Sequence, residues 1–271
     1  MVSLAEREHA EKIRSAIAAS KNLPSLLVPH ETFARLRAPA ETTVFPLDYA
    51  FHLLGDVRGK TVLEYGCGDG RYTVILAKRG AKVVAFDISA PLLALAKKRI
   101  ELNGCDGVKL LLGSAHALPL ADESVDIIFG MAILHHLDLK LASREVRRVL
   151  RKDGRGIFKE PVRNSKLLAR LRKVFPQHGD VSPFERPLTD REIEDFAMAY
   201  KHRARTFQLP LSRIAHVLRV ENERAIDFCA RVDSYLLRRF PSLVYYGAVK
   251  VFEMAKPQKA QEQAGQSTSA F

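Results

Sequence analysis

Residues 61–87, TVLEYGCGDGRYTVILAKRGAKVVAFD, decide the fold of this chain. An apolar, β-branched run ends at Tyr65, closely spaced glycines follow, a helical pattern starts near Arg71, and a second apolar run ends at Asp87. Apolar runs that alternate with helical patterns predict parallel strands joined by helices. The alternation continues through VKLLL, VDIIFG and GIFKE, so we expect an α/β domain over residues 58–256.

The segments on either side of this alternating pattern have different patterns of apolar and polar residues. Residues 1–57 carry helical patterns and predict an N-terminal helical cap or lid. Towards the C-terminus, RARTFQL and YGAVKVFEMAK read as two further strands, and helices are expected between them up to Arg239. The polar tail at 257–271, with its Gln, Ser and Gly content, is predicted to be disordered.

The overall composition is that of an ordinary globular protein. Of 271 residues, 47% are hydrophobic and 27% are charged, which excludes a collagen-like, coiled-coil or wholly disordered chain. The three cysteines have no CxxC spacing, so we expect neither a disulfide framework nor a metal site, and we expect a cytoplasmic location. No stretch has the roughly 18 apolar residues that a membrane span requires.

The net charge of +12 is concentrated in one part of the chain. Between Lys140 and Lys173 thirteen Lys or Arg stand against three acidic residues, a net charge of +10. Phe158 is the only aromatic residue there, whereas binders of single-stranded RNA interleave rings with their charges, so nucleic-acid binding is not favoured. The helical pattern from Arg163 to Phe175 has a basic stripe beside an apolar one, which fits either a peripheral contact with an anionic membrane or a helix packed on the domain.

The glycine-rich turn and Asp87 form the strongest chemical signal. Glycines at 66, 68 and 70 between a strand and a helix allow a ligand to approach the backbone. A dinucleotide fingerprint would need a sixth-position glycine, where this chain has Arg71. Asp87, at the end of the next strand, is suited to accept hydrogen bonds from both ribose hydroxyls of a nucleoside. The alternative is a tight turn and a helix-capping Asp with no ligand.

These motifs resemble those of the class I S-adenosylmethionine-dependent methyltransferases, in particular the group that includes ubiquinone and menaquinone biosynthesis methyltransferases. The resemblance covers about Thr61 to Pro161 and rests on VLEYGCGDG, VVAFDIS, LLGSAHALPLADESVDIIFGMAILHHL and LRKDGRGIFKEP. It implies a Rossmann-like, doubly wound seven-stranded sheet whose last strand is antiparallel, with a helical insertion at about 211–240. It also implies S-adenosylmethionine as cofactor. No metal is expected, because the sequence shows no cluster of ligand residues.

The same resemblance assigns expected roles to individual residues. The glycine turn would line the methionine part of the cofactor, Asp87 would hold the ribose, and Ile88 would pack on adenine. Ser114 stands where many relatives carry an Asp that binds the adenine amino group, so the Ala115 backbone is an alternative partner. The full expected cofactor set is Glu64, Gly66, Gly68, Gly70, Asp87, Ile88, Ser114, Ala115 and Met131.

Candidates for contact with the methyl acceptor lie at the ends of later strands and in the cap. His135 and His136 follow the fourth strand and are the best candidates for a catalytic base, although a structural hydrogen bond is the alternative role. Glu160 and Arg163 follow the fifth strand and are expected to line the substrate pocket. Phe33 and Tyr49 in the N-terminal cap are expected to close over it.

The sequence lacks the motifs of several methyltransferase classes, which narrows the range of methyl acceptors that we expect. The residues after the fourth strand are GMAI rather than DPPY or NPPY, which disfavours methylation of adenine or glutamine amino groups, and no Pro-Cys nucleophile for cytosine is present. We therefore expect methyl transfer to O, N or C of a small, aromatic or lipid-like metabolite. Two alternatives stay open: an RNA-modifying methyltransferase of the same fold, and a non-catalytic cofactor-binding subunit. The sequence does not specify an oligomeric state.

Overall fold

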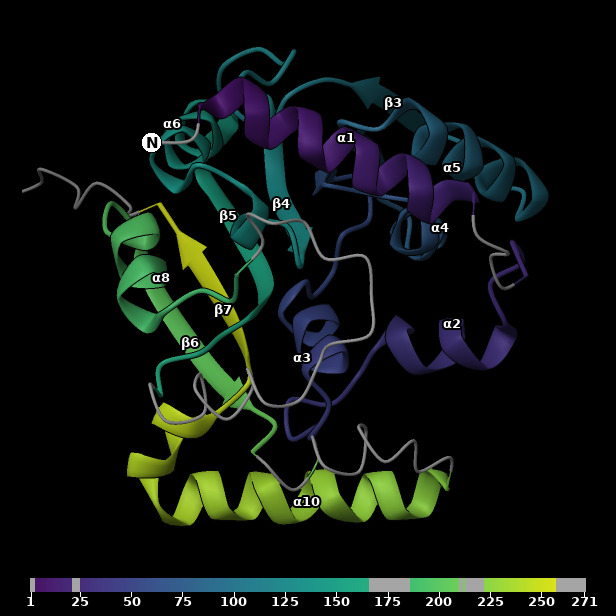
Figure 1. The fold of residues 1–271 in the computed structure, drawn as a ribbon. Helices are drawn as coiled ribbons and strands as arrows, with labels where there is room; N and C mark the ends of the chain where they lie inside the picture. Colours follow the sequence, from purple (N-terminus) through teal and green to yellow (C-terminus); the bar gives the residue numbers. More distant parts are fainter. Residues whose placement is uncertain (1–2, 21–24, 166–185, 210–211, 213–221, 257–271) are drawn as a thin grey trace, which may run out of the picture.

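A computed structural model describes residues 3–20, 25–165, 186–209, 212 and 222–256. Within these residues the chain forms a seven-stranded sheet of order β3-β2-β1-β4-β5-β7-β6, in which β7 runs antiparallel to β5 and to β6 (Figure 1). The predicted doubly wound sheet with an antiparallel last strand is therefore confirmed. The strands are β1 (Thr61–Tyr65), β2 (Lys82–Asp87), β3 (Val108–Leu112), β4 (Val125–Met131), β5 (Leu150–Pro161), β6 (Lys201–Phe207) and β7 (Val249–Ala255).

Helices cover both faces of the sheet, and each face has its own apolar core. One core includes Phe158 of β5 with Val146 and Phe196 from two covering helices, and the other includes Phe51 and Ile75 against the opposite face. The helices are α1 (Leu4–Ser20), α2 (His30–Arg37), α3 (Pro46–Leu53), α4 (Arg71–Lys78), α5 (Ala90–Leu102), α6 (Leu139–Val149), α8 (Asp190–Ala197) and α10 (Glu223–Arg239), with short 3-10 turns η1 (Leu134–His136) and η2 (Pro241–Tyr246).

The register of the parallel strands brings the loops that follow β1, β2 and β4 to one edge of the sheet. Tyr65 of β1 pairs with Phe86 of β2 and with Gly130 of β4, so the residues that follow these strands emerge side by side. In such sheets, ligands bind beyond the carboxyl ends of the strands, where the strand order reverses. The glycine turn, Asp87 and the loop after β4 therefore meet at this edge.

The N-terminal helix crosses the same edge. α1 packs against α5, while α3 packs against β5 and β7 (Figure 1). Among its described residues, the expected cap at 1–57 contains α1, α2 and α3, and α1 shares a pocket with the glycine turn.

Some predicted segments fall wholly or partly outside the described residues. These are most of the helix expected from Arg163 to Phe175, the tail at 257–271, and the first part of the insertion at 211–240, whose second part is α10. Of the residues that are described, no helix is both long and apolar enough to cross a membrane.

Candidate functional site

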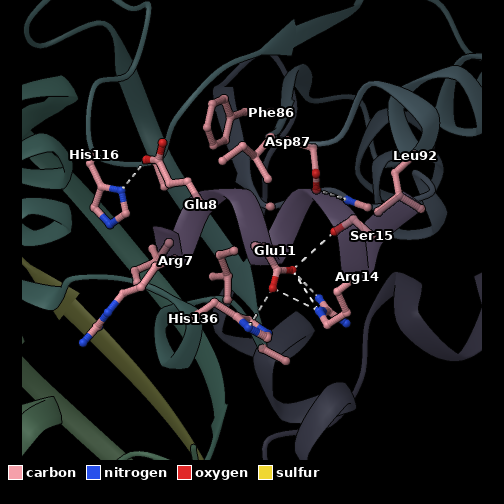
Figure 2. Close-up of a pocket in the computed structure, with 17 residues that line it drawn as sticks. Arg7, Glu8, Glu11, Arg14, Ser15, Phe86, Asp87, Leu92, His116 and His136 are labelled. Carbon is pink, nitrogen blue, oxygen red and sulfur yellow. Dashed lines mark hydrogen bonds and ion pairs between the residues drawn. The ribbon is translucent and has the colours of Figure 1, made fainter. Parts of the chain in front are cut away.

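A pocket lies between α1 and the carboxyl edge of the sheet (Figure 2). Its floor is formed by the glycine turn, by Phe86 to Ile88 after β2, and by residues after β4. Its roof is formed by one face of α1, which contributes Arg7, Glu8, Glu11, Arg14 and Ser15. Of the residues predicted from the sequence, those that line this pocket are Gly66, Gly68, Asp87, Ile88, Ala115 and His136.

The three glycines of the turn share a left-handed backbone but have different surroundings. Their φ angles are +80°, +54° and +79° for Gly66, Gly68 and Gly70, a region that residues with a β-carbon avoid. A β-carbon at Gly66 would lie 2.7 Å from Ile133 Cδ1, and one at Gly70 would lie 2.8 Å from Ala96 Cβ. A β-carbon at Gly68 would meet no protein atom within 4 Å. Gly66 and Gly70 therefore permit close packing, whereas Gly68 leaves open space at the pocket.

Asp87 is a nearly buried carboxylate that braces the glycine turn. Its Oδ2 accepts a hydrogen bond of 2.8 Å from the Gly68 amide, and its Oδ1 accepts one of 2.9 Å from the Ser89 amide. Burial raises the pKa of Asp87, and the backbone hydrogen bonds oppose that rise. The Ser89 side chain, not Asp87, caps α5. Each carboxylate oxygen keeps lone-pair capacity for a further donor such as a ribose hydroxyl.

Glu64 lies beneath the turn rather than in the pocket lining. It is 2% exposed and accepts a hydrogen bond from the Thr73 hydroxyl. Burial raises the pKa of Glu64 to about 8, despite the opposing effect of the Thr73 hydrogen bond. A carboxyl group in this state is mostly protonated at neutral pH, and a cation placed nearby would favour its ionised form.

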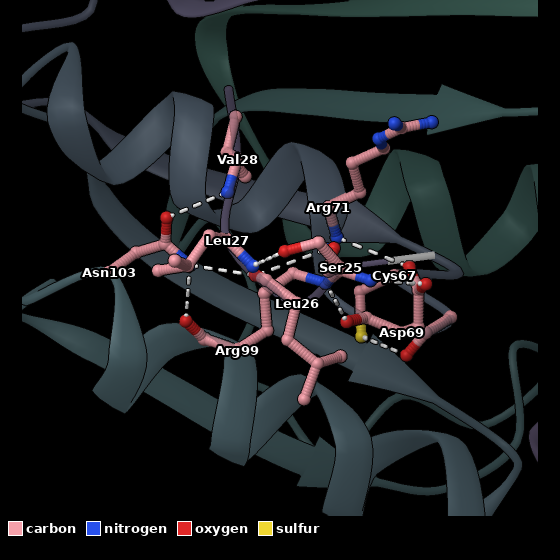
Figure 3. Close-up of polar contacts among 10 residues, drawn as sticks. Ser25, Leu26, Leu27, Val28, Cys67, Asp69, Arg71, Arg99 and Asn103 are labelled. Atoms are coloured by element: carbon pink, nitrogen blue, oxygen red, sulfur yellow. Dashed lines mark hydrogen bonds and ion pairs between the residues drawn. The ribbon is translucent and has the colours of Figure 1, made fainter. Parts of the chain in front are cut away.

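The segment that joins α1 to α2 is tied to the outer side of the glycine turn (Figure 3). Arg99, 2% exposed, donates to the carboxylate of Asp69 at 2.7 Å and to two backbone carbonyls of residues 25–28 at 3.3 Å. The Asn103 side chain accepts from the Val28 amide at 3.0 Å. These bonds hold residues 25–28, which precede α2, next to the glycine turn.

The structure places Glu160 and His135 away from the pocket lining. Glu160 is fully buried, and its Oε1 accepts hydrogen bonds from the Ile133 and Leu134 amides at 2.9 and 2.8 Å. Its Oε2 lies 2.8 Å from His135 Nδ1. Glu160 therefore holds the loop after β4 and does not line the pocket beneath α1, and its contact with an acceptor stays a prediction. His135 is the partner of Glu160 in that buried pair and does not line the pocket, so its role as a base stays a prediction.

His136 lines the pocket, and its partner comes from α1. Its Nδ1 lies 3.3 Å from Glu11 Oε2, and its ring centroid lies 4.0 Å from that of His135. Although burial acts to raise the pKa of Glu11, hydrogen bonds with His136 and Arg14 lower it to about 2. Glu11 is therefore an ionised carboxylate at the pocket wall.

A second contact between α1 and the sheet involves the loop after β3. The Ser114 hydroxyl donates to Glu8, and His116 Nδ1 lies 3.0 Å from the same Glu8 oxygen. His116 Nε2 accepts from the Asp138 amide at 3.0 Å, which fixes the ring. Ser114 lines a second, adjoining hollow with Ile88 rather than the pocket beneath α1.

The other predicted residues lie near the edge but do not line either hollow. Met131 and Phe33 pack against the core beneath α3, and Tyr49 stacks on His52 with the Arg205 guanidinium 5.0 Å from its ring centre. Arg163 is half-buried, and its backbone amide pairs with Leu188. Their contacts with an acceptor stay predictions. Across the described part of the chain no group of His, Cys, Asp or Glu could hold a metal ion.

Sequence reasoning missed the pocket residues from α1, and it also missed His116 and the apolar residues Phe86, Leu92, Ala132, Ile133 and Leu137. Glu8 and Glu11 share one helical face at a spacing of three, beside Ser15 at a further four. That pattern could have marked a continuous polar face, but the same pattern occurs on any solvated helix. Nothing in the sequence specifies that this face turns towards His116 and His136.

Comparison with known proteins finds methyltransferases among the proteins that are similar to this chain. Residues 63–158 match the family model described as a methyltransferase domain. An uncharacterized methyltransferase-like protein of Schizosaccharomyces pombe is 28% identical over 217 residues, which is 67% of this chain and 83% of that protein. The malonyl-[acyl-carrier protein] O-methyltransferase of Xylella fastidiosa is 31% identical over 57% of this chain, and the match spans only 56% of that relative's length.

A solved structure supports the fold over nearly the whole chain. Geranyl diphosphate C-methyltransferase from Streptomyces coelicolor, in complex with Mg2+, geranyl diphosphate and S-adenosyl-L-homocysteine, superposes with a TM-score of 0.59 at 15% identity. The superposition covers 92% of this chain and 98% of that one.

Proposed function

Because residues 63–158 match the methyltransferase domain family, we propose that the chain transfers a methyl group from S-adenosylmethionine to O, N or C of a small molecule. The observation that carries the proposal is the open space at Gly68 beside the Asp87 carboxylate, in a pocket that α1 covers. This arrangement fits a nucleoside whose ribose lies on Asp87 and whose tail passes the glycine turn.

The residues present fit each part of that cofactor. Asp87 would accept from the ribose hydroxyls, Ile88 and Ala115 would border the adenine, and Gly66 and Gly68 would allow the methionine part to approach the backbone. When bound, S-adenosylmethionine supplies an electrophilic methyl group on a sulfonium, which transfers by in-line displacement. The contribution of the protein is to align the acceptor and exclude water, and a helix over the pocket is suited to the second task.

The acceptor side of the pocket mixes apolar and basic groups. Ile133 and Leu137 provide apolar walls, His136 provides a base for an acceptor that keeps a proton, and Arg7 provides a cation from α1. The similar proteins described above are named as a malonyl-[acyl-carrier protein] O-methyltransferase and a geranyl diphosphate C-methyltransferase. The apolar walls support a small, aromatic or lipid-like acceptor, and we expect the reaction to take place in the cytoplasm.

Label transfer tests this proposal. The purified protein would be incubated with S-adenosylmethionine carrying a labelled methyl group and with separate metabolite and RNA fractions of a cell extract. We expect label in a small-molecule product, identified by its mass, and no label with Asp87→Ala. Label only in RNA would favour the RNA-modifying alternative. Cofactor binding without any labelled product would favour the non-catalytic alternative.

A further inference from the structure

The contact between Glu11 and His136 joins the cover of the pocket to its candidate base. Glu11 Oε2 lies 3.3 Å from His136 Nδ1, and the two side chains are only 16% and 8% exposed. Both residues line the pocket, and Figure 2 shows Glu11 at the centre of a network that also reaches Arg14 and Ser15. The pair is therefore part of the pocket wall rather than a surface ion pair.

Glu11 is held in one orientation by its own helix. Arg14 Nε donates to Glu11 at 3.0 and 3.1 Å, and the Ser15 hydroxyl donates at 3.3 Å. These residues are three and four positions further along α1, so the helix itself sets the direction of the carboxylate. Because Glu11 is ionised at neutral pH, its oxygens can only accept hydrogen bonds.

An acceptor-only partner determines which nitrogen of a neutral histidine carries the proton. With Glu11 next to Nδ1, the proton is expected on Nδ1, and Nε2 keeps the free lone pair. The His135 ring, 4.0 Å away and itself paired with Glu160, restricts His136 from the other side. The remaining charged or titratable groups around the pocket are Arg7, Glu8, Asp87 and His116, besides Arg14.

We propose that Glu11 is a positioning residue, which holds the proton of His136 on Nδ1 and so makes Nε2 the base, and that this base is complete only when α1 lies over the pocket. The inference rests on the proposed function. Nε2 takes the proton of an acceptor hydroxyl or amine while the acceptor's electron pair forms the bond to the methyl carbon. The carbon–sulfur bond breaks with its pair moving to sulfur, and the resulting imidazolium is stabilised by the Glu11 carboxylate.

Nuclear magnetic resonance of the imidazole nitrogens tests the assignment without knowledge of the acceptor. Protein with 15N-labelled histidine would be saturated with S-adenosylhomocysteine, and long-range proton–nitrogen spectra would be recorded at a pH where His136 is neutral. His136→Gln assigns the signals. We expect a protonated Nδ1 and an unprotonated Nε2 in the wild type. In Glu11→Ala we expect a shift towards the Nε2-protonated form, with partial recovery in Glu11→Asp.

A matched control separates positioning from a general effect on α1. Glu6→Ala also removes a carboxylate from α1, but from an exposed site that contacts Ser3, so it should leave the His136 signals unchanged. On the acceptor identified by label transfer, Glu11→Ala should lower turnover about 10- to 100-fold, with unchanged affinity for S-adenosylhomocysteine.

The outcomes distinguish this inference from the proposed function. An unchanged His136 tautomer in folded Glu11→Ala would overturn the positioning role, whether or not methyl transfer occurs. Loss of S-adenosylhomocysteine affinity with the tautomer unchanged would instead make Glu11 a cofactor ligand. A changed tautomer with no labelled product in any fraction would leave Glu11 as the partner of His136 and remove the proposed reaction.

Discussion

Alanine at Gly68 and at Gly70 should separate ligand binding from stability, although the two glycines are only two positions apart. At Gly70, alanine pays about 1–2 kcal/mol for the left-handed backbone. It also places a β-carbon 2.8 Å from Ala96 Cβ and 2.9 Å from Ala96 Cα. Overpacking of this kind costs about 1–3 kcal/mol, because the backbone of α5 must move. We therefore expect Gly70→Ala to lower the free energy of unfolding by about 2–5 kcal/mol.

At Gly68 only the backbone cost applies. A β-carbon there meets no protein atom within 4 Å, so the free energy of unfolding should fall by about 1–2 kcal/mol. The same β-carbon would stand in the space where the cofactor approaches the turn. We expect its affinity for S-adenosylhomocysteine to fall at least about tenfold, or about 1.4 kcal/mol.

Urea denaturation and titration calorimetry on both variants measure the two effects. Since about 1 kcal/mol shifts the melting temperature by about 2–4 °C in a domain of this size, the two stability losses can also be resolved by thermal unfolding. The folded fraction of Gly70→Ala should bind the ligand with near-normal affinity. If Gly68→Ala binds normally while Gly70→Ala loses affinity without losing stability, the assignment of the two glycines is refuted.

Three further perturbations test separate parts of the site. Asp87→Ala should weaken S-adenosylhomocysteine binding by about 1.5–3 kcal/mol in calorimetry, because hydrogen bonds to a charged acceptor are lost, and normal affinity would remove Asp87 from the ribose site. Glu64 has a pKa raised from 4.5 to about 8, so between these values the unfolded chain is the more ionised form and stability falls as pH rises. In urea titrations across this window Glu64→Gln should show a shallower fall, and an identical slope would contradict the buried, protonated state. For the predicted helix that begins at Arg163, sedimentation with anionic but not neutral vesicles, weakened by salt and abolished by Lys166→Glu with Arg170→Glu, would support membrane contact, whereas protein left in the supernatant at low salt would oppose it.

The glycine turn and Asp87 could be predicted because their chemistry is local. A strand, a run of glycines and a helix within a short segment specify both the backbone shape and the exposed edge, and the parallel pairing of β1 with β2 then brings Asp87 beside the turn. The hydrogen bond between Asp87 and the Gly68 amide spans only 19 residues. Such short-range relations are visible in a sequence.

The role of α1 could not be predicted, because it depends on contacts between distant residues. Glu8 reaches His116, 108 residues later, and the polar face that does so has the same composition as a solvated helix. The surroundings of Glu160 could not be predicted for a different reason. Successive residues of a strand point to opposite sides, and the position of a carboxylate at a strand end does not reveal that two backbone amides and a histidine will enclose it.

A crystal structure of the protein with S-adenosylhomocysteine tests the central claim most directly. The account predicts the ligand beneath α1, with both ribose hydroxyls on the Asp87 carboxylate and the homocysteine part against Gly66 and Gly68. It also predicts His136 within reach of the space next to the ligand sulfur, with Glu11 at its Nδ1. A ligand bound elsewhere, or bound here with its ribose away from Asp87, would contradict the account.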